Sequence, residues 1–292
     1  MTIWGTLLNY SLKSDIVVIE NCNNDNSLIP KKGQDLRTVP FHFYRSSTDI
    51  RPTYGSFVSN GQTILHLSTA SGPYCWAYSD MLAIGVTTQI LTGPKVPDSP
   101  RLQWGETEIF YPGTPAYEAL ASRAPLPPVL NSIENRAHFS MWCILSSPLT
   151  LSFDFADTDV VDKVWPVVTN TEAIAVNQDW AGILGGLFFE STETVILPHC
   201  AWIWAGDPNC TLPVIQHIYK PLSNSAVAVL VMNHGNSTIN DSVNLSSIPG
   251  LACASTQCSV RDINAHVDLG TFTGTIPVNS LASHDVAFFR IY

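Results

Sequence analysis

The pattern of hydrophobic residues changes near Gly182, and this change limits the folds that the chain can adopt. Before Gly182, short β-branched runs alternate with segments of helical periodicity. After it, short apolar runs are separated by Gly, Asn, Pro and Ser, without helical periodicity. The first pattern is typical of a parallel α/β architecture and the second of an antiparallel β-sandwich. We therefore predict two domains, residues 1–182 and 183–292.

Several segments of the first domain can be assigned individually. The run Ile-Val-Val-Ile at residues 16–19 predicts a buried parallel strand, and residues 39–44 predict a second, weaker strand. Residues 149–153 predict a further short strand. Helices are expected at residues 55–67, 134–145 and 157–169.

These segments form three or four strand–helix units, whereas a complete (β/α)8 TIM barrel needs about 250 residues. The sequence therefore predicts the C-terminal half of such a barrel, an α/β part, followed by an all-β antiparallel sandwich. Residues 86–133 interrupt the alternation, because they hold many prolines and little periodicity. A stretch of that kind usually covers a site or is poorly ordered, so we expect a long insertion there.

The composition excludes several classes of protein. Hydrophobic residues make up 45% of the 292 residues and charged residues 13%, so the chain can bury a sizeable core. The sequence contains no run of about 18 apolar residues that would predict a membrane span. The formal net charge of −10 argues against a nucleic-acid partner, because phosphates require a basic surface. A neutral ligand such as a sugar fits this charge.

The cysteines allow two interpretations. Seven cysteines are present, and none forms a CxxC pair that would indicate a zinc or redox motif. Cys200 with Cys210, and Cys253 with Cys258, are local pairs near the C-terminus. They are either disulfides of a secreted protein or buried free thiols.

Glycosylation sequons cluster in the second half of the chain, which favours a glycosylated, extracytoplasmic protein. The five sequons begin at Asn9, Asn209, Asn236, Asn240 and Asn244. Residues 1–15 nevertheless lack the basic region and the clean apolar core of a signal peptide. We interpret this conflict as a sign that the true N-terminus lies upstream.

Carboxyl groups are the side chains from which a candidate site can be built. Cleavage of a glycosidic bond usually needs two of them, and 24 acidic residues are present, so only position discriminates. Asp49 and Asp80 are the best placed, because carboxylates just after barrel strands face the site. Arg45 can orient sugar hydroxyls through its fork of donors. The simpler interpretations are a helix cap for Asp49, a turn for Asp80 and a surface cation for Arg45.

Several motifs resemble segments of glycoside hydrolase family 27, the α-galactosidase or melibiase family, in the family's order. FYRSSTDI resembles the segment that carries the general acid/base. CWAYSDMLAIG is similar to the family's W-N-D-P-D-M-L stretch, although residues 77–79 differ. ENRAHFSMWCILSSPLTLSFD resembles the last barrel helix and strand, and EAIAVNQDWAG the strand exit into the C-terminal domain. VRDINAHVDLGTFTG and SHDVAFFRIY resemble the end of that domain.

The resemblance implies a role for each matching residue. Asp49 would be the general acid/base, and Arg45 and Asp80 would hydrogen-bond the sugar. Met81 would pack beside the sugar. The remaining substrate-binding positions implied by the family are Cys22 and Trp76. Cys22 commonly forms a disulfide in the family, but the partner's place is taken by Phe41 in this chain.

The family's nucleophile is the aspartate of a K-x-D-G motif, and this chain departs from that pattern. Lys13-Ser14-Asp15 is not an equivalent, because no glycine follows it and it directly precedes the predicted strand at 16–19. We therefore expect the first four barrel strands and the nucleophile to be absent from the chain. His138, within an apolar helix, is expected to be a buried histidine with its hydrogen bonds satisfied.

The implied function is that of a retaining α-galactosidase acting on terminal α-galactosyl groups, without a metal or cofactor. The alternatives are a non-catalytic carbohydrate-binding remnant and an incomplete gene model. The expected partner is the α-galactoside substrate, with no nucleic acid and no membrane, and a homodimer is compatible with the family. A full-length protein would be secreted, lysosomal or vacuolar. An isolated half barrel is expected to fold poorly, because its strand edges are unpaired.

Overall fold

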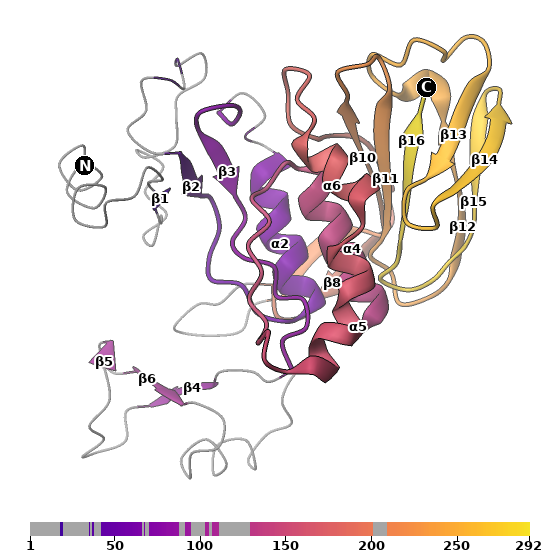
Figure 1. Cartoon of the computed structure of the whole chain (residues 1–292). Coiled ribbons are helices and arrows are strands. Elements are labelled where there is room, and N and C mark those ends of the chain that lie inside the picture. Colours follow the sequence, from indigo (N-terminus) through magenta and orange to yellow (C-terminus); the bar gives the residue numbers. More distant parts are fainter. Residues whose placement is uncertain are drawn as a thin grey trace.

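The computed structural model describes residues 18–19, 35, 37, 42–65, 67, 70–87, 91–94, 103–104, 107–110, 129–200 and 209–292. Figure 1 shows helices α2, α4 and α6 between a small parallel sheet and a larger antiparallel sheet. Within these residues, no helix is long and apolar enough to cross a membrane.

The small sheet is parallel, as the alternation of strands and helices in the sequence predicts. Its order is β1 (Val18–Ile19), β2 (Phe43–Arg45) and β3 (Trp76–Tyr78). Helix α2 (Tyr54–Leu65) connects β2 to β3, which makes a βαβ unit. The predicted strand at 149–153 is reduced to one parallel bridge between Leu82 and Leu151. Pro148 precedes this segment, and such a short run forms few ladder hydrogen bonds.

The other helices begin at asparagine or aspartate caps. Helix α4 (Ser132–Ile144) has a capping box in which the side chain of Asn131 and the side chain of Glu134 bond each other's backbone N–H. Helix α5 (Thr158–Val168) is capped by Asp157. Both expected helices are therefore confirmed, with α4 beginning two residues early.

The segment after α5 corrects one expectation. The motif at residues 172–182, taken as the exit of a strand, contains helix α6 (Thr171–Gln178) instead. The side chain of Asn170 accepts hydrogen bonds from the backbone N–H groups of Glu172 and Ala173, which starts the helix. Glu172 also places an acidic charge in the first turn, where it favours the helix.

The C-terminal residues form antiparallel sheets, as predicted. The six-stranded sheet has the order β14-β13-β16-β11-β10-β7, and β12 pairs with β15 and β8 with β9. The strands are β7 (Gly186–Glu190), β8 (Thr194–Leu197), β9 (Cys210–Pro213), β10 (Ile215–Pro221), β11 (Val227–Asn233), β12 (Ile239–Asn244), β13 (Cys258–Asp262), β14 (Val267–Phe272), β15 (Thr275–Leu281) and β16 (Val286–Ile291). A short 3-10 helix, η3 (Leu245–Ser247), follows β12.

The six-stranded sheet is covered on both faces, and strand β11 shows how. Its odd-numbered residues from Val227 to Val231 face a core shared with β12 and β15. Its even-numbered residues from Ala228 to Met232 face a second core that includes Trp142 of α4. Each fully buried aliphatic side chain contributes about 1.5–3 kcal/mol, so the sheet and the helices stabilise each other.

The insertion at 86–133 is not without structure. Its described residues contain a three-stranded antiparallel sheet of β4 (Leu91–Pro94), β6 (Thr107–Phe110) and β5 (Gln103–Trp104). The expectation of a segment without regular structure is therefore wrong for these residues. Short strands interrupted by prolines leave too few residues for an alternating pattern to be recognised.

Candidate active site

The candidate site lies where two neighbouring parallel strands end. Arg45 is the last residue of β2 and pairs with Tyr78, the last residue of β3. Asp49 follows in the loop after β2, and Asp80 comes two residues after β3. In parallel α/β proteins, ligands bind at the carboxyl ends of the strands, so these side chains are placed where a site is expected.

Arg45 joins the two carboxylates. Its Nη1 atom lies 2.6 Å from an oxygen of Asp49 and 3.1 Å from an oxygen of Asp80. The side chains of Arg45 and Asp80 are only 7% and 5% exposed, whereas that of Asp49 is 48% exposed. The two carboxylates therefore differ in character, because one is buried and fixed and the other is open to solvent.

Asp80 is held by the backbone as well as by Arg45. Its Oδ2 atom accepts a hydrogen bond from the N–H of Ile50 (2.8 Å), and its Oδ1 atom accepts one from the N–H of Met81 (2.7 Å). The backbone of Asp80 has a φ of 84°, in the left-handed region that non-glycine residues rarely adopt. Burial raises the pKa of Asp80, and the N–H of Met81 and the charge of Arg45 oppose this rise.

Two helices fix the backbone around the site. Trp142 of α4 donates a hydrogen bond from Nε1 to the carbonyl oxygen of Asp80 (2.9 Å). Asn60 of α2 donates from Nδ2 to the carbonyl oxygens of Thr48 (3.0 Å) and Ser79 (3.1 Å), so one amide spans both site loops. Sequence reasoning missed both residues, because a tryptophan or asparagine inside a helix gives no signal of a distant partner.

The other predicted site residues, Met81, Trp76 and Cys22, do not all lie beside Arg45, Asp49 and Asp80. Met81 is 40% exposed beside Asp80. Trp76 instead packs edge-to-face on Trp180, with ring centroids 5.1 Å apart, and joins the hydrophobic core. Cys22 lies outside the described residues. Within those residues, no group of three or more His, Cys, Asp or Glu side chains is arranged to hold a metal ion.

The C-terminal sheets hold the start of α2, directly after the loop that carries Asp49. The hydroxyl of Tyr54 lies 2.9 Å from Nδ1 of His234, and its ring stacks on His284 at 3.8 Å. Gly55 approaches the turn after β8 so closely that a Cβ there would lie 2.1 Å from the carbonyl oxygen of Pro198. Only glycine can occupy this position without moving the backbone.

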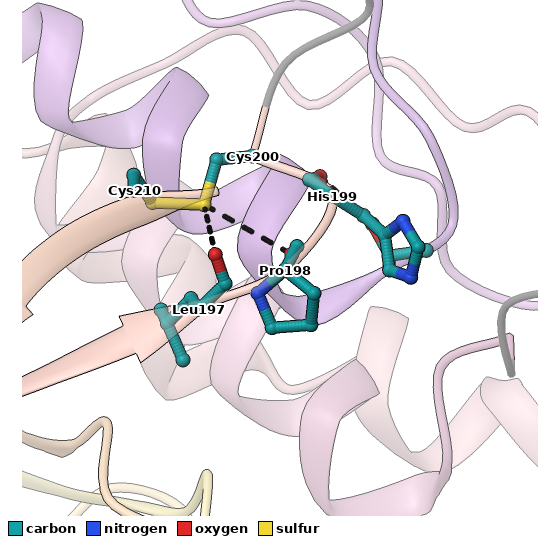
Figure 2. Close-up of a disulfide and its surroundings, with 6 residues drawn as sticks. Leu197, Pro198, His199, Cys200 and Cys210 are labelled. Atoms are coloured by element: carbon teal, nitrogen blue, oxygen red, sulfur yellow. Dashed lines mark hydrogen bonds between the residues drawn. A yellow bond between two sulfur atoms is a disulfide. The ribbon is translucent and has the colours of Figure 1, made fainter. Parts of the chain in front are cut away.

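A disulfide closes that turn. Figure 2 shows Cys200 bonded to Cys210, which joins the ends of β8 and β9 beside Pro198 and His199. The second local pair, Cys253 and Cys258, is also a disulfide, so the disulfide interpretation of both pairs is confirmed. Cys75 and Cys143 are free and buried, and burial raises the pKa of the Cys75 thiol to about 12. A thiol with so high a pKa is unreactive at neutral pH.

His138 of α4 differs from its expectation in one respect. The ring is fully buried, as predicted; it stacks on Phe57 with centroids 4.6 Å apart and packs edge-to-face against Trp142 with centroids 4.2 Å apart. Neither ring nitrogen has a hydrogen-bond partner in the described structure, so the expectation of satisfied hydrogen bonds is wrong. Burial lowers the pKa of His138 to about 3, which keeps the ring neutral.

Comparison with known proteins agrees with this arrangement. Residues 215–291 match the family described as the α-galactosidase C-terminal β-sandwich domain. The α-galactosidase of Oryza sativa subsp. japonica is 29% identical over 246 residues, which are 84% of this chain and 43% of that protein. The α-galactosidase of Coffea arabica is 28% identical over 156 residues, which are 53% of this chain and 34% of that protein. This chain thus spans well under half the length of these curated relatives.

Solved structures show the same fold over the described chain. The structure of α-galactosidase I from Mortierella vinacea has a TM-score of 0.66 and 18% identity, covering 99% of this chain and 61% of that one. The α-galactosidase of Saccharomyces cerevisiae has a TM-score of 0.66 and 15% identity, covering 100% of this chain and 67% of that one. The matched C-terminal domain and the curated relatives support an α-galactosidase family member that covers only part of the full-length enzyme, and the solved structures show the shared fold.

Proposed function

We propose that this chain is the acid/base half of a retaining α-galactosidase. The observation that carries the proposal is the group at the ends of β2 and β3, where buried Arg45 holds an exposed Asp49 beside a buried Asp80. In a retaining mechanism, one carboxyl group protonates the leaving oxygen and later takes a proton from water. Asp49 suits that role, because its side chain is open to solvent while its position is fixed by Arg45.

Asp80 suits sugar binding better than proton transfer. Both of its oxygens accept backbone hydrogen bonds, from Ile50 and Met81, so the carboxylate cannot rotate. Each carboxylate oxygen can accept two hydrogen bonds, and a sugar hydroxyl would donate to the second lone pair of Oδ1. Exposed Met81 would cover the apolar face of the ring. We propose Arg45 as a further donor to the sugar; Trp76 and Cys22 stay predictions from the resemblance.

The parallel strands β1 to β3 and the Leu82–Leu151 bridge are proposed to be the C-terminal part of a (β/α)8 barrel. The proposed division of the chain is residues 1–182 for this part and 183–292 for the β-sandwich. A retaining mechanism needs a second carboxyl group across the sugar, and the K-x-D-G motif that supplies it in the family has no match here. We therefore propose galactose binding without hydrolysis for this chain by itself.

Ligand-observed NMR with galactose, and with glucose as the epimeric control, tests the proposal on the purified chain. We expect saturation transfer to galactose that is lost in Asp80→Asn and kept in Asp159→Asn, an exposed aspartate of α5 that serves as the matched control. Equal binding of both sugars, or galactose binding that survives Asp80→Asn, would contradict the proposed site.

An assay with a chromogenic α-galactoside distinguishes a chain that only binds galactose from one that also hydrolyses galactosides. We expect no turnover by the chain alone. Turnover that Asp49→Asn abolishes would show that a nucleophile is present, and would refute the proposed absence of that group while supporting the role of Asp49.

A further inference from the structure

Three of the predicted sequons gather at one strand of the sandwich. Asn240 and Asn244 lie on β12, and Asn236 lies in the turn that precedes it. All three side chains are exposed. Successive residues of a strand point to opposite faces, so Asn240 and Asn244, four positions apart, share a face of the β12–β15 sheet.

That face carries no charged side chain in the described strands β12 and β15. The only charged residue of β12 and β15, Asp241, points inward and bonds His217 of β10 at 2.6 Å. The buried residues Val243, Ile276 and Val278 face the core. The exposed residues of the two strands are Asn240, Ser242, Asn244, Thr275, Pro277, Asn279 and Ser280.

Two of these asparagines, Asn240 and Asn244, accept hydrogen bonds through the side-chain oxygen. Oδ1 of Asn240 accepts from the N–H of Ser280 (2.8 Å), and Oδ1 of Asn244 accepts from the N–H (3.0 Å) and hydroxyl (2.8 Å) of Ser246. Within the described structure, no Nδ2 atom of the three asparagines donates a hydrogen bond. Buried Asn233, by contrast, uses its Nδ2 atom for three hydrogen bonds.

We propose that Asn236, Asn240 and Asn244 carry N-linked glycans, which cover the outer face of the β12–β15 sheet. Attachment of a glycan replaces one hydrogen of Nδ2 and leaves Oδ1 as an acceptor. The hydrogen bonds that Asn240 and Asn244 make in the folded protein are therefore kept in the modified protein. The two disulfides point to the same oxidising compartment in which N-glycosylation occurs.

The transfer needs a lipid-pyrophosphate-linked oligosaccharide and the transferase of the secretory pathway. A bond forms between Nδ2 of the asparagine and the anomeric carbon of the first sugar. The bond between that carbon and the pyrophosphate oxygen breaks, and the lipid pyrophosphate leaves with the electron pair. The amide proton passes to solvent, and no group is oxidised or reduced.

The place of the glycans has two consequences for the molecule. Both strands of the two-stranded β12–β15 sheet have an edge unpaired by the described strands, and bulky polar groups on β12 protect such edges from pairing with another chain. Figure 1 shows β12 and β15 on the side of the sandwich away from α2 and α4, so the glycans would leave the carboxyl ends of β2 and β3 open. This inference is independent of the proposed galactose site.

Intact-mass measurement of the full chain, exported through the secretory pathway of a eukaryotic host, tests the proposal. Treatment with peptide-N-glycosidase should lower the mass and convert Asn236, Asn240 and Asn244 to aspartate in the peptide map. Each of Thr238→Ala, Ser242→Ala and Ser246→Ala should remove one glycan while keeping its asparagine. Ser237→Ala, which changes the middle residue of the sequon that begins at Asn236, is the matched control and should keep all three glycans.

Two outcomes would overturn the proposal. One is a mass that the glycosidase leaves unchanged, and the other is a peptide map in which only sequons outside β12 and its preceding turn are converted. The peptide map uses the unmodified sequence, so it tests the three asparagines even where a variant fails to fold. Because the measurement needs no galactoside, a failure here is distinct from a failure of the proposed sugar site.

Discussion

The site loops and the sandwich are stabilised in different ways. In the sandwich, the strands pair along antiparallel ladders, and β11 alone pairs with β10 over seven positions and with β16 over six. The loops that carry Asp49 and Asp80 are held instead by single side chains from distant elements, such as Asn60 and Trp142. The sandwich therefore has redundant support, whereas the site can be disturbed by one change at a distance.

One contact between the two regions lies at the start of α2, in addition to the packing of α4 on β10, β11 and β16. Tyr54, Gly55 and the preceding Thr53 all contact the sandwich side, and Thr53 donates to the carbonyl oxygen of His199 (3.3 Å). Because these residues follow Asp49 within six positions, the sandwich fixes the loop that carries the proposed acid/base. The sandwich therefore helps to hold the candidate site in place.

Gly55→Ala should have the largest effect on this contact. The new Cβ would collide with the backbone oxygen of Pro198, so we expect the free energy of unfolding to fall by about 3 kcal/mol. Gly61→Ala is the matched control in the same helix, because its Cβ would meet the flexible side chain of Met141 and not a backbone atom. Chemical denaturation measures both, and equal losses would show that the start of α2 is not specially constrained.

Removal of the Cys200–Cys210 disulfide should have the next largest effect. The chain-entropy model gives a loss of about 2–3 kcal/mol for a loop of this length, and the freed turn should no longer restrain Thr53 and Gly55. We expect faster amide hydrogen exchange at those residues in the Cys200→Ser/Cys210→Ser variant. The Cys253→Ser/Cys258→Ser variant should lose stability without that local effect. Identical exchange at the start of α2 in both variants would contradict the account.

Lys220 tests the contact from the sandwich side. This fully buried lysine of β10 donates hydrogen bonds from Nζ to the hydroxyl of Ser146 and to the carbonyl oxygens of Val176 and Asn177 at the end of α6. Burial lowers the pKa of Lys220 to about 8, against a usual value near 10.5. Between pH 8 and about 10.5 the unfolded chain binds more protons, so stability from this group rises with pH in that window.

We expect this rise to reach about 2 kcal/mol in the parent chain relative to Lys220→Met, when unfolding free energies are compared at pH 7 and pH 10. The variant subtracts the titration of other groups, such as the buried tyrosines. A pH dependence that is the same in both proteins would mean that Lys220 does not titrate as a buried amine.

His138→Leu should have a smaller effect, and a stabilising one. The ring nitrogens of His138 have no partner in the described structure. Replacing them with apolar atoms removes the cost of burying them without hydrogen bonds, so we expect the free energy of unfolding to rise by about 1 kcal/mol at pH 7. The gain should grow below pH 6.5, because the parent chain must keep its ring neutral down to the folded pKa of about 3. Thermal unfolding at pH 7 and pH 5 measures this, and a destabilised variant would refute the interpretation.

The elements that the sequence predicts correctly carry their own local signals. Asp157 caps α5, and the capping box of Asn131 and Glu134 starts α4, so each signal lies next to the helix that it begins. Arg45, Asp49 and Asp80 could likewise be selected by their places after predicted strands, and the structure brings the three together. Their roles in sugar binding and catalysis stay predictions.

The features that were missed depend on partners distant in the sequence. No local pattern shows that Gly55 must be glycine, because the atom that excludes a side chain belongs to Pro198. The short strand expected at 149–153 reads as largely apolar, yet it forms only one isolated bridge, between Leu151 and Leu82. His138 looks like an ordinary buried histidine until its surroundings, Phe57 and Trp142, prove to be apolar rings.

Amide hydrogen exchange at Ile50 in the Tyr54→Phe variant tests the central claim most directly. The N–H of Ile50 donates to Asp80 and so reports the integrity of the site, while the variant removes only the hydroxyl that bonds His234 of the sandwich. If the sandwich holds the site, Ile50 should exchange faster in the variant, and Leu230 in the centre of β11 should keep its protection. Unchanged exchange at Ile50 would contradict the claim, because the site loop would then keep its structure without this contact.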